Sequence, residues 1–216
     1  ARGGGDPDMN PLLRAMIDEA RADNMPNDNI ERAIKKGTGE AKDATQIEEV
    51  MYEGFGPCGV ALYIKALTDN RNRTIASLKV IVSKNGGNMG TAGSVGYLFK
   101  KMGVMEVLLH EKIDVDKIEL AAIDAGAEDV MVVDVGEESG AQTAAVEIYT
   151  NPQALMQVRS VLEKSGLKIT AARLIYVPQM EVPINDEATA QALVNLIEAI
   201  EEDDDVAAVY SNFSYK

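Results

Sequence analysis

The order of periodic segments between residues 104 and 181 restricts the fold more than any other feature of the chain. Strands are predicted at 104–109, 129–135, 144–149 and 169–177, and helices at 113–125 and 152–164. Gly126 and Gly166 follow the two helical segments, where glycine commonly ends a helix. The order strand, helix, strand, strand, helix, strand is that of a ferredoxin-like domain.

The segments on either side of this block predict that it is an insertion. Residues 47–103 contain a strand, a tight turn at 54–59, a second strand and a helix that ends near Asn85. A third strand is predicted at 95–99, with a turn at 100–103. Residues 182–216 supply only a helix at 186–201 and a strand at 206–213, too little for a domain. We therefore expect 47–103 plus 182–216 to form a middle α/β domain, with 104–181 inserted.

Residues 1–46 have a different pattern. Asn10 and Pro11 precede apolar residues at helical spacing, and a second short helix is predicted to end at Gly37. Residues 38–46 are polar and small, as in a linker. The sequence therefore predicts an α+β protein of three domains, namely a helical N-terminal domain at 1–46, the middle domain and the inserted ferredoxin-like domain.

Composition narrows the classes of protein to which the chain can belong. No apolar run approaches the ~18 residues of a membrane-spanning helix, and no signal peptide is predicted. The single cysteine, Cys58, cannot form an internal disulfide. We therefore expect a cytoplasmic protein with no membrane partner.

Charge is distributed unevenly along the chain, whose net charge is −14. Residues 65–101 carry seven basic side chains and one acidic side chain, Asp69, so this stretch has a net charge of +6. A polyanion senses the field within a Debye length of about 10 Å, and not the total charge. The stretch therefore predicts contact with phosphates, although pairing with the acidic remainder of the protein is an alternative.

Three motifs in this half of the chain have both a functional and a structural interpretation. Asp69–Thr74 places arginines and asparagines where a strand meets a helix N-terminus, which favours a phosphate site, but a capping turn has the same residues. The glycine-rich segment 85–94 either approaches a sugar-phosphate backbone or simply ends a helix, and it is not a P-loop. Phe55 either stacks on a base or covers a sheet edge.

The sequence offers no catalytic or metal-binding constellation. Cys58 and His110 lie in different predicted units, so we expect no nucleophilic pair, no enzyme activity and no small-molecule substrate. No Cys/His cluster predicts zinc, and no cofactor is expected. The acidic run 201–205 would suit a hard cation, but a solvated turn at a helix end is the expected structure.

Several strings together resemble one family. They are Gly3–Asp8, Asn24–Pro26, Asn29–Gly37, Tyr52–Gly59, Asp69–Thr74, Asn85–Gly90, Gly93–Phe99, Ala125–Val130 and Asp203–Val206. In order and across nearly the whole chain, they resemble the YebC/PmpR family of probable transcriptional regulators, whose mitochondrial relatives are translational activators of cytochrome oxidase. That family usually has glycine where this chain has Cys58. It also begins with a strongly basic segment that these 216 residues do not include.

The resemblance implies a non-enzymatic regulator of gene expression that binds nucleic acid, in the first instance a DNA-binding transcriptional regulator. A translation factor that binds RNA or the ribosome, or a protein-interaction scaffold whose acidic half docks a basic partner, is the alternative. The residues predicted to contact nucleic acid are Lys65, Asn70, Arg71, Asn72, Arg73, Lys79, Lys84, Asn85, Asn88, Lys100 and Lys101.

Overall fold

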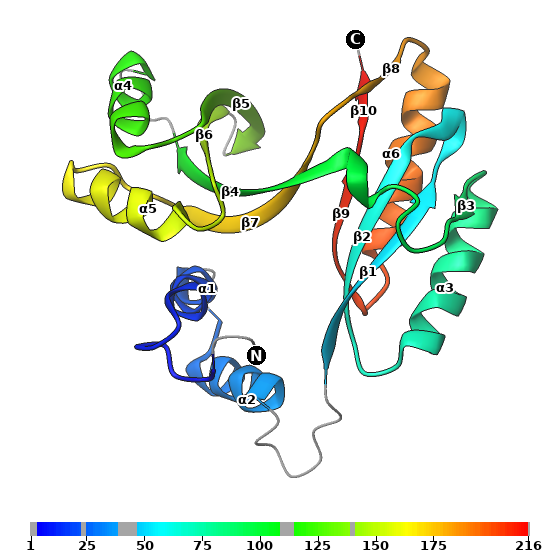
Figure 1. Cartoon of the computed structure of the whole chain (residues 1–216), viewed down its shortest axis with the longest axis horizontal. Helices are drawn as coiled ribbons and strands as arrows, with labels where there is room; N and C mark the ends of the chain where they lie inside the picture. Colours follow the sequence, from blue (N-terminus) through cyan, green and yellow to red (C-terminus); the bar gives the residue numbers. More distant parts are fainter. Residues whose placement is uncertain (1–3, 23–24, 39–46, 109–114, 139–140, 216) are drawn as a thin grey trace. The chain divides into compact units, whose positions relative to one another are not determined.

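Two four-stranded sheets, each packed against two helices, form the core of this α+β protein (Figure 1). A computed structural model of the chain describes residues 4–22, 25–38, 47–108, 115–138 and 141–215. The chain divides into two compact units: unit 1 is Ala1–Thr38 with Lys101–Ile175, and unit 2 is Gly39–Lys100 with Tyr176–Lys216. Among the helices described, none is long and apolar enough to cross a bilayer.

The N-terminal residues form the two predicted helices. Helix α1 spans Pro11–Ala22 and helix α2 spans Asn27–Thr38. The Oδ1 atom of Asn10 accepts a hydrogen bond from the amide of Leu13 at 3.2 Å, so Asn10 caps α1 as its position predicts. The predicted linker at 38–46 lies almost wholly outside the described residues, and the assignment of 1–46 to a separate domain stays a prediction.

The sheet of unit 1 has the order predicted for a ferredoxin-like domain. Its elements are β4 (Phe99–Leu108), α4 (Val115–Ala125), β5 (Asp129–Glu138), β6 (Ala141–Thr150), α5 (Leu155–Lys164) and β7 (Ala171–Pro178). The strand order is β5-β6-β4-β7, and β6 pairs antiparallel with both β4 and β5. Helices α4 and α5 cover one face, where Met105, Ile148 and Leu162 are fully buried.

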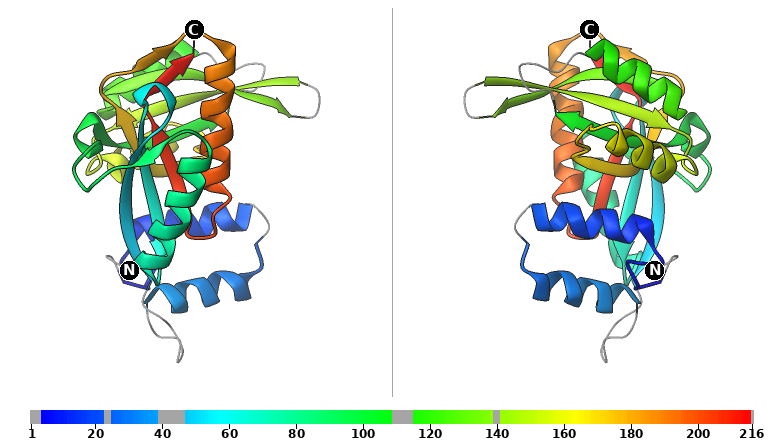
Figure 2. Two further views of the ribbon diagram at one scale, coloured as in Figure 1. Left: turned by 90° about the vertical axis from the view of Figure 1, so that its right-hand side faces the viewer. Right: turned by 90° about the vertical axis from the view of Figure 1, so that its left-hand side faces the viewer.

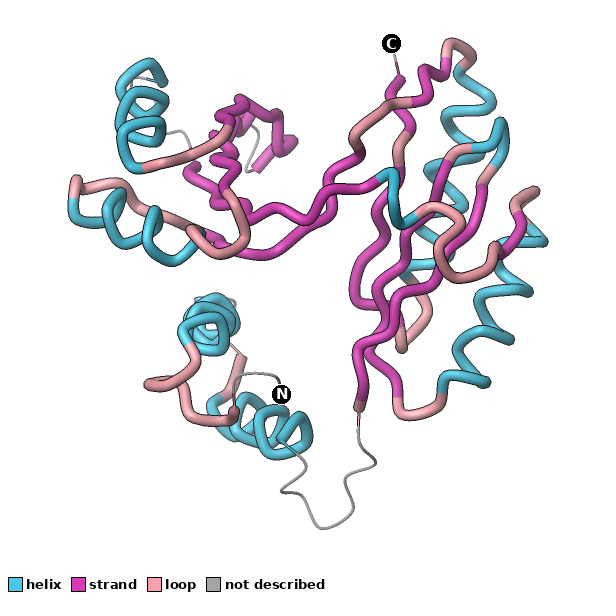
Figure 3. Tube along the Cα trace, in the orientation of Figure 1, coloured by secondary structure: helices cyan, strands magenta, loops and turns pink. Residues whose placement is uncertain are grey.

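Strand β4 corrects one sequence prediction. Instead of a strand at 95–99 and a turn at 100–103, the chain forms a 3₁₀ turn at Gly96–Leu98 and one continuous strand from Phe99 (Figure 3). Gly103 is a close-packing residue and not a turn residue. A Cβ at this position would lie 2.6 Å from Oγ1 of Thr150 and 2.9 Å from Cβ of Leu155.

The sheet of unit 2 combines strands from both ends of the chain. Its elements are β1 (Glu48–Phe55), β2 (Ala61–Thr68), α3 (Arg71–Lys84), β3 (Asn88–Met89), α6 (Glu187–Glu201) and β9 (Val206–Ser211). The strand order is β3-β1-β2-β9, with β2 antiparallel to β1 and to β9. Residues 206–211 thus return to the sheet that residues 48–68 begin.

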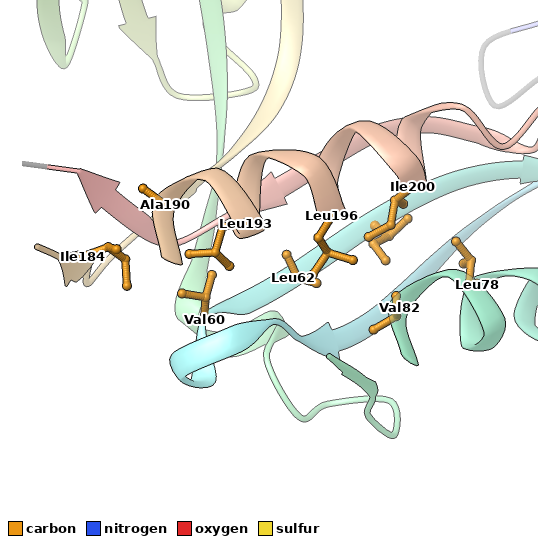
Figure 4. Close-up of a cluster of buried hydrophobic side chains, with 10 residues drawn as sticks. Val60, Leu62, Leu78, Val82, Ile184, Ala190, Leu193, Leu196 and Ile200 are labelled. Carbon is orange, nitrogen blue, oxygen red and sulfur yellow. The ribbon is translucent and has the colours of Figure 1, made fainter. Parts of the chain in front are cut away.

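Helices α3 and α6 lie side by side on one face of this sheet (Figures 1 and 2). Leu62 of β2, Leu78 of α3 and Leu196 of α6 are fully buried in the cluster between them (Figure 4). The opposite face has a smaller cluster in which Tyr63 stacks on Phe99. Phe55 belongs to this second cluster, so it packs against the sheet. This agrees with its structural interpretation and not with an exposed ring that stacks on a base.

The predicted strand at 206–213 is divided at Asn212. Its Oδ1 accepts a hydrogen bond from the amide of Ala61 at 2.7 Å, and its Nδ2 donates to the carbonyl of Met180. Beyond it, β10 (Phe213–Tyr215) pairs in parallel with β8 (Val182–Ile184), two short strands that the sequence analysis did not predict. The predicted domain limits at 103/104 and 181/182 stay predictions; the unit limits fall within β4 and β7.

The turn between β1 and β2 contains the one strained residue among those described. Cys58, in the 3₁₀ turn Pro57–Gly59, has φ 58° and is the only residue other than glycine with a positive φ. This left-handed conformation costs an ordinary residue about 1–2 kcal/mol and glycine almost nothing. The backbone therefore explains why glycine would suit this position.

Candidate nucleic-acid interface

The N-terminus of α3 is the predicted phosphate site, and in the structure it is capped from within the protein. The Oδ1 atom of Asn70 accepts a hydrogen bond from the amide of Arg73 at 3.1 Å. Asp205, in the turn between α6 and β9, accepts from Nη2 of Arg73 at 2.8 Å and from Oγ1 of Thr74 at 2.7 Å. Its side chain is 15% exposed. Burial alone raises the pKa of Asp205, but the hydrogen bonds from Thr74 and Arg73 hold the pKa below its ordinary value.

Two further cations of the basic stretch are also paired. The guanidinium of Arg71 donates two hydrogen bonds of 2.5 Å to the carboxylate of Glu48 on β1. Nζ of Lys65 lies 3.7 Å from a carboxylate oxygen of Glu49. Arg71 and Arg73 are therefore paired within the protein, and a phosphate would first have to displace these carboxylates. Contact of the two arginines with nucleic acid stays a prediction.

The structure of the acidic run 201–205 also differs from the solvated turn that the sequence predicts. Asp204 is exposed, as in a solvated turn, but Asp203 and Asp205 both accept hydrogen bonds from α3. The donor to Asp203 is Oγ of Ser77. These aspartates thus fix the α6–β9 turn on the first two turns of α3. The prediction of a solvated turn was wrong for both.

The basic residues of unit 2 do not all lie on one face of its sheet. On β2, Leu62, Ile64 and Ala66 are buried on the face that the helices cover. Because successive residues of a strand point to opposite faces, Lys65 lies on the face opposite α3. Lys79 and Lys84 are exposed on α3, and neither makes an ion pair with the residues that the structure describes. Asn72 is exposed near the start of the same helix.

The remaining predicted residues lie in and after the glycine-rich segment. Asn85 ends α3, and its Nδ2 donates to the carbonyl of Ile81, so its amide has a structural role. Asn88 is exposed on β3, which pairs with β1. Lys100 and Lys101 are exposed at the start of β4.

The side chain of Glu53, on β1, organises the glycine-rich segment. The sequence did not indicate this role, because the amides that Glu53 binds lie about 40 residues further along the chain. The carboxylate of Glu53 accepts hydrogen bonds from the amides of Gly93 at 2.7 Å, Val95 at 2.5 Å and Gly96 at 2.9 Å. Its own carbonyl accepts from Gly90 at 2.8 Å. Burial alone raises the pKa of Glu53, but the three amides outweigh burial and lower the pKa. The part of the glycine-rich segment that follows Met89 therefore folds around a buried carboxylate.

Tyr97 is a candidate that the sequence analysis missed. It is 71% exposed, although it is surrounded in sequence by the buried residues Val95 and Phe99. Its carbonyl accepts a hydrogen bond from Nε2 of Gln179, and the amide of Gln179 donates to Leu98, so the backbone here is fixed. An outward-pointing aromatic ring on a fixed turn suits stacking on an unpaired base. The only available signal was a tyrosine between a glycine-rich segment and two lysines.

No catalytic or metal centre is apparent in the described part of the chain. No group of three His, Cys, Asp or Glu side chains is placed there to hold a metal ion. Cys58 is exposed at its turn, and His110 lies outside the described residues.

Family models match nearly the whole chain. Residues 1–40 match the TACO1/YebC protein N-terminal domain, and residues 47–213 match the TACO1/YebC second and third domain. The chain is therefore an α+β protein of a family whose bacterial members carry regulatory names. It belongs to the TACO1/YebC family.

Individual relatives agree with this assignment. The chain is 47% identical over 212 residues to a probable transcriptional regulatory protein of Halothermothrix orenii, covering 98% of this chain and 80% of the relative. It is 48% identical over 212 residues to another of the same name in Persephonella marina, covering 98% and 81%. The crystal structure of a conserved hypothetical protein, Aq1575 from Aquifex aeolicus, is similar with a TM-score of 0.86 and 44% identity, covering 99% of this chain and 84% of that one.

The two neighbouring aspartates allow a matched test of the α3 cap. Replacing Asp205 with Asn leaves Thr68, Thr74 and Arg73 without the carboxylate they share, so we expect a loss of about 1–3 kcal/mol in the free energy of unfolding. Asp204→Asn, at the exposed position beside it, should change stability by less than about 0.5 kcal/mol. Urea unfolding followed by circular dichroism measures both, and equal effects would contradict the assigned role of Asp205.

Glu53 makes a pH-dependent contribution to stability. Because its pKa is lowered on folding, its stabilisation is complete above the unfolded pKa of 4.5 and is lost as the pH falls through the lower folded pKa. Glu53→Gln should remove this part of the acid dependence and reduce hydrogen-exchange protection of the Gly93, Val95 and Gly96 amides. Glu198→Gln, at an exposed position on α6, is the control. An unchanged acid profile in Glu53→Gln would refute this account.

Proposed function

We propose that the protein is a regulator of gene expression that binds nucleic acid through unit 2. The family names support the regulatory role, and the observation that carries the binding site is the exposure of Lys79 and Lys84 on α3. The arginines of the same helix are neutralised by Glu48 and Asp205. The two lysines are therefore the cations of α3 that can reach a phosphate without first breaking an ion pair.

The spacing of the lysines fits contacts with separate phosphates. They are five residues apart, which corresponds to about 7.5 Å along the helix axis and about 140° around it, so the two side chains leave the helix in different directions. Each phosphate contact releases condensed counterions, so binding should weaken steeply as salt rises. Lysine contacts of this kind read no base sequence, and the selection of a target site would depend on other contacts.

Charge reversal of Lys79 and Lys84 tests the site. The double variant Lys79→Glu/Lys84→Glu should lower affinity for nucleic acid and reduce the slope of log K against log salt by about 2, because two phosphate contacts are lost. Reversing Arg71 and Arg73 is a poorer test, since it also breaks the ion pairs with Glu48 and Asp205.

The matched control is Lys164→Glu/Lys168→Glu, which reverses two exposed lysines of unit 1. Fluorescence anisotropy with a labelled 25-base-pair duplex and a labelled RNA of the same sequence, each over a salt series, measures all three proteins. The same loss in both double variants would mean that total charge, and not the α3 surface, determines binding. No change in either would exclude α3 as the interface.

The exposed ring of Tyr97 favours a single-stranded nucleic acid as the target. For this reason RNA is favoured over duplex DNA. Every unpaired base presents a face on which an aromatic ring can stack, whereas bases in a duplex are already stacked. Lys100, three residues further along and also exposed, follows the ring at the start of β4. This surface supports a role in translation as the second candidate function, with ribosomal or messenger RNA as the partner.

Replacing Tyr97 with Ala distinguishes these targets. We expect a loss of about 1–3 kcal/mol in binding to single-stranded RNA, the energy of one base stacked on an aromatic ring, and little change with duplex DNA. Tyr97→Phe retains the ring and should restore binding to RNA. Equal binding of single-stranded RNA by Tyr97→Ala and the parent protein would exclude stacking at this position.

A further inference from the structure

Strand β5 is an open edge of the unit 1 sheet. It is the terminal strand in the order β5-β6-β4-β7, and β6 is its one neighbour among the described residues. Its register with β6 is regular from Asp129 to Asp134 and shifts before Glu137. An edge of this length presents a row of backbone amides and carbonyls that can pair with another strand. Figure 2 shows the β5–β6 hairpin extending beyond α4 and α5.

The middle of this edge is apolar on both faces. Met131 is 50% exposed and Val132 is 55% exposed, and consecutive residues of a strand point to opposite faces. Leu120 and Ile123 are also exposed on α4, the helix that packs beside β5. Edge strands that have no partner are usually blunted with lysine, proline or a charged side chain at the centre. Residues 130–133 of β5 have none of these, and the charged residues nearest to them along the strand are Asp129 and Asp134.

Acidic residues border the apolar edge. Residues 115–133 carry Asp116, Glu119, Asp124, Glu128 and Asp129 against one lysine, Lys117. On the sheet face without helices, Glu106 and Glu147 lie opposite each other on β4 and β6, with Arg173 3.8 Å from both carboxylates. The surface around β5 therefore has a net negative charge, which disfavours a nucleic-acid phosphate backbone and favours a cationic partner.

We propose that the β5 edge binds an extended segment of a partner protein with an apolar centre and basic residues at its ends. The segment adds a fifth strand to the sheet by backbone hydrogen bonds to Asp129–Asp134. Its apolar side chains cover Met131 and Val132, and its lysines or arginines meet the acidic border. A second copy of this chain fits poorly, because pairing β5 with itself brings two surfaces of the same negative charge together.

A designed peptide tests the pairing with the full chain. The probe is a fluorescein-labelled nine-residue peptide of alternating valine and threonine with two lysines at each end. One comparison peptide carries glutamates in place of the lysines, and another has a central proline, which cannot donate to a sheet and is confined in φ. We expect the lysine peptide to bind about tenfold or more tightly than either comparison peptide, since each removes one half of the recognition.

Two variants locate the binding site. Met131→Lys/Val132→Lys places charges at the centre of the edge and should reduce affinity for the lysine peptide by about tenfold or more. Ser160→Lys/Val161→Lys, at two exposed positions of α5, adds the same charge, so it is the matched control and should leave affinity unchanged. Hydrogen exchange on the unaltered chain should show that the peptide increases protection of the β5 amides, which supports the site even if the double variant folds poorly.

The outcomes decide between the proposal and its rivals. Equal binding of the lysine and glutamate peptides, equal losses in both variants, or protection that misses β5 would overturn it. A concentration-dependent dimer of the parent chain that Met131→Lys/Val132→Lys abolishes would assign the edge to a second copy instead. None of these results depends on nucleic-acid binding by α3, so the two proposals fail or succeed separately.

Discussion

The carboxylate of Asp205 joins the two segments of chain from which unit 2 is built. It accepts hydrogen bonds from Thr68 at the end of β2 and from Thr74 in the first turn of α3, while its backbone lies in the turn between α6 and β9. Thr74 and Asp205 are 131 residues apart in the sequence. The position of α3 on its sheet, and therefore the direction in which its lysines point, depends on this contact.

The same contact changes how the charge of the chain should be interpreted. A segment with a net charge of +6 looks like a site for polyanions, but its arginines are held by carboxylates from β1 and from the α6–β9 turn. The charge that a ligand can use is what remains after these pairs form. On α3 this remainder is Lys79 and Lys84, and it is smaller and further from the helix N-terminus than the sequence predicted.

Sequence periodicity predicted most of the architecture, because each long helix and strand buries one continuous apolar face. The order of elements in unit 1 and the caps at Asn10 and Asn70 follow from local patterns. Glu53 could not be predicted, since its partners lie about 40 residues further along the chain. Gly103 was misassigned because glycine beside lysines resembles a turn, and only the packed Thr150 shows its real role. Tyr97 was missed because the exposure of a side chain depends on residues that are distant in the sequence.

The pairing of β2 with β9 has a kinetic consequence. The amide of Ala61 bonds to a side chain 151 residues away, so the central strand of this sheet lacks one of its partners until residues 206–212 have been synthesised. Closing so long a loop is slow, and an unpaired strand edge is exposed meanwhile. During translation, unit 1 can form from a shorter stretch of chain, whereas unit 2 must wait until residues 206–212 have left the ribosome.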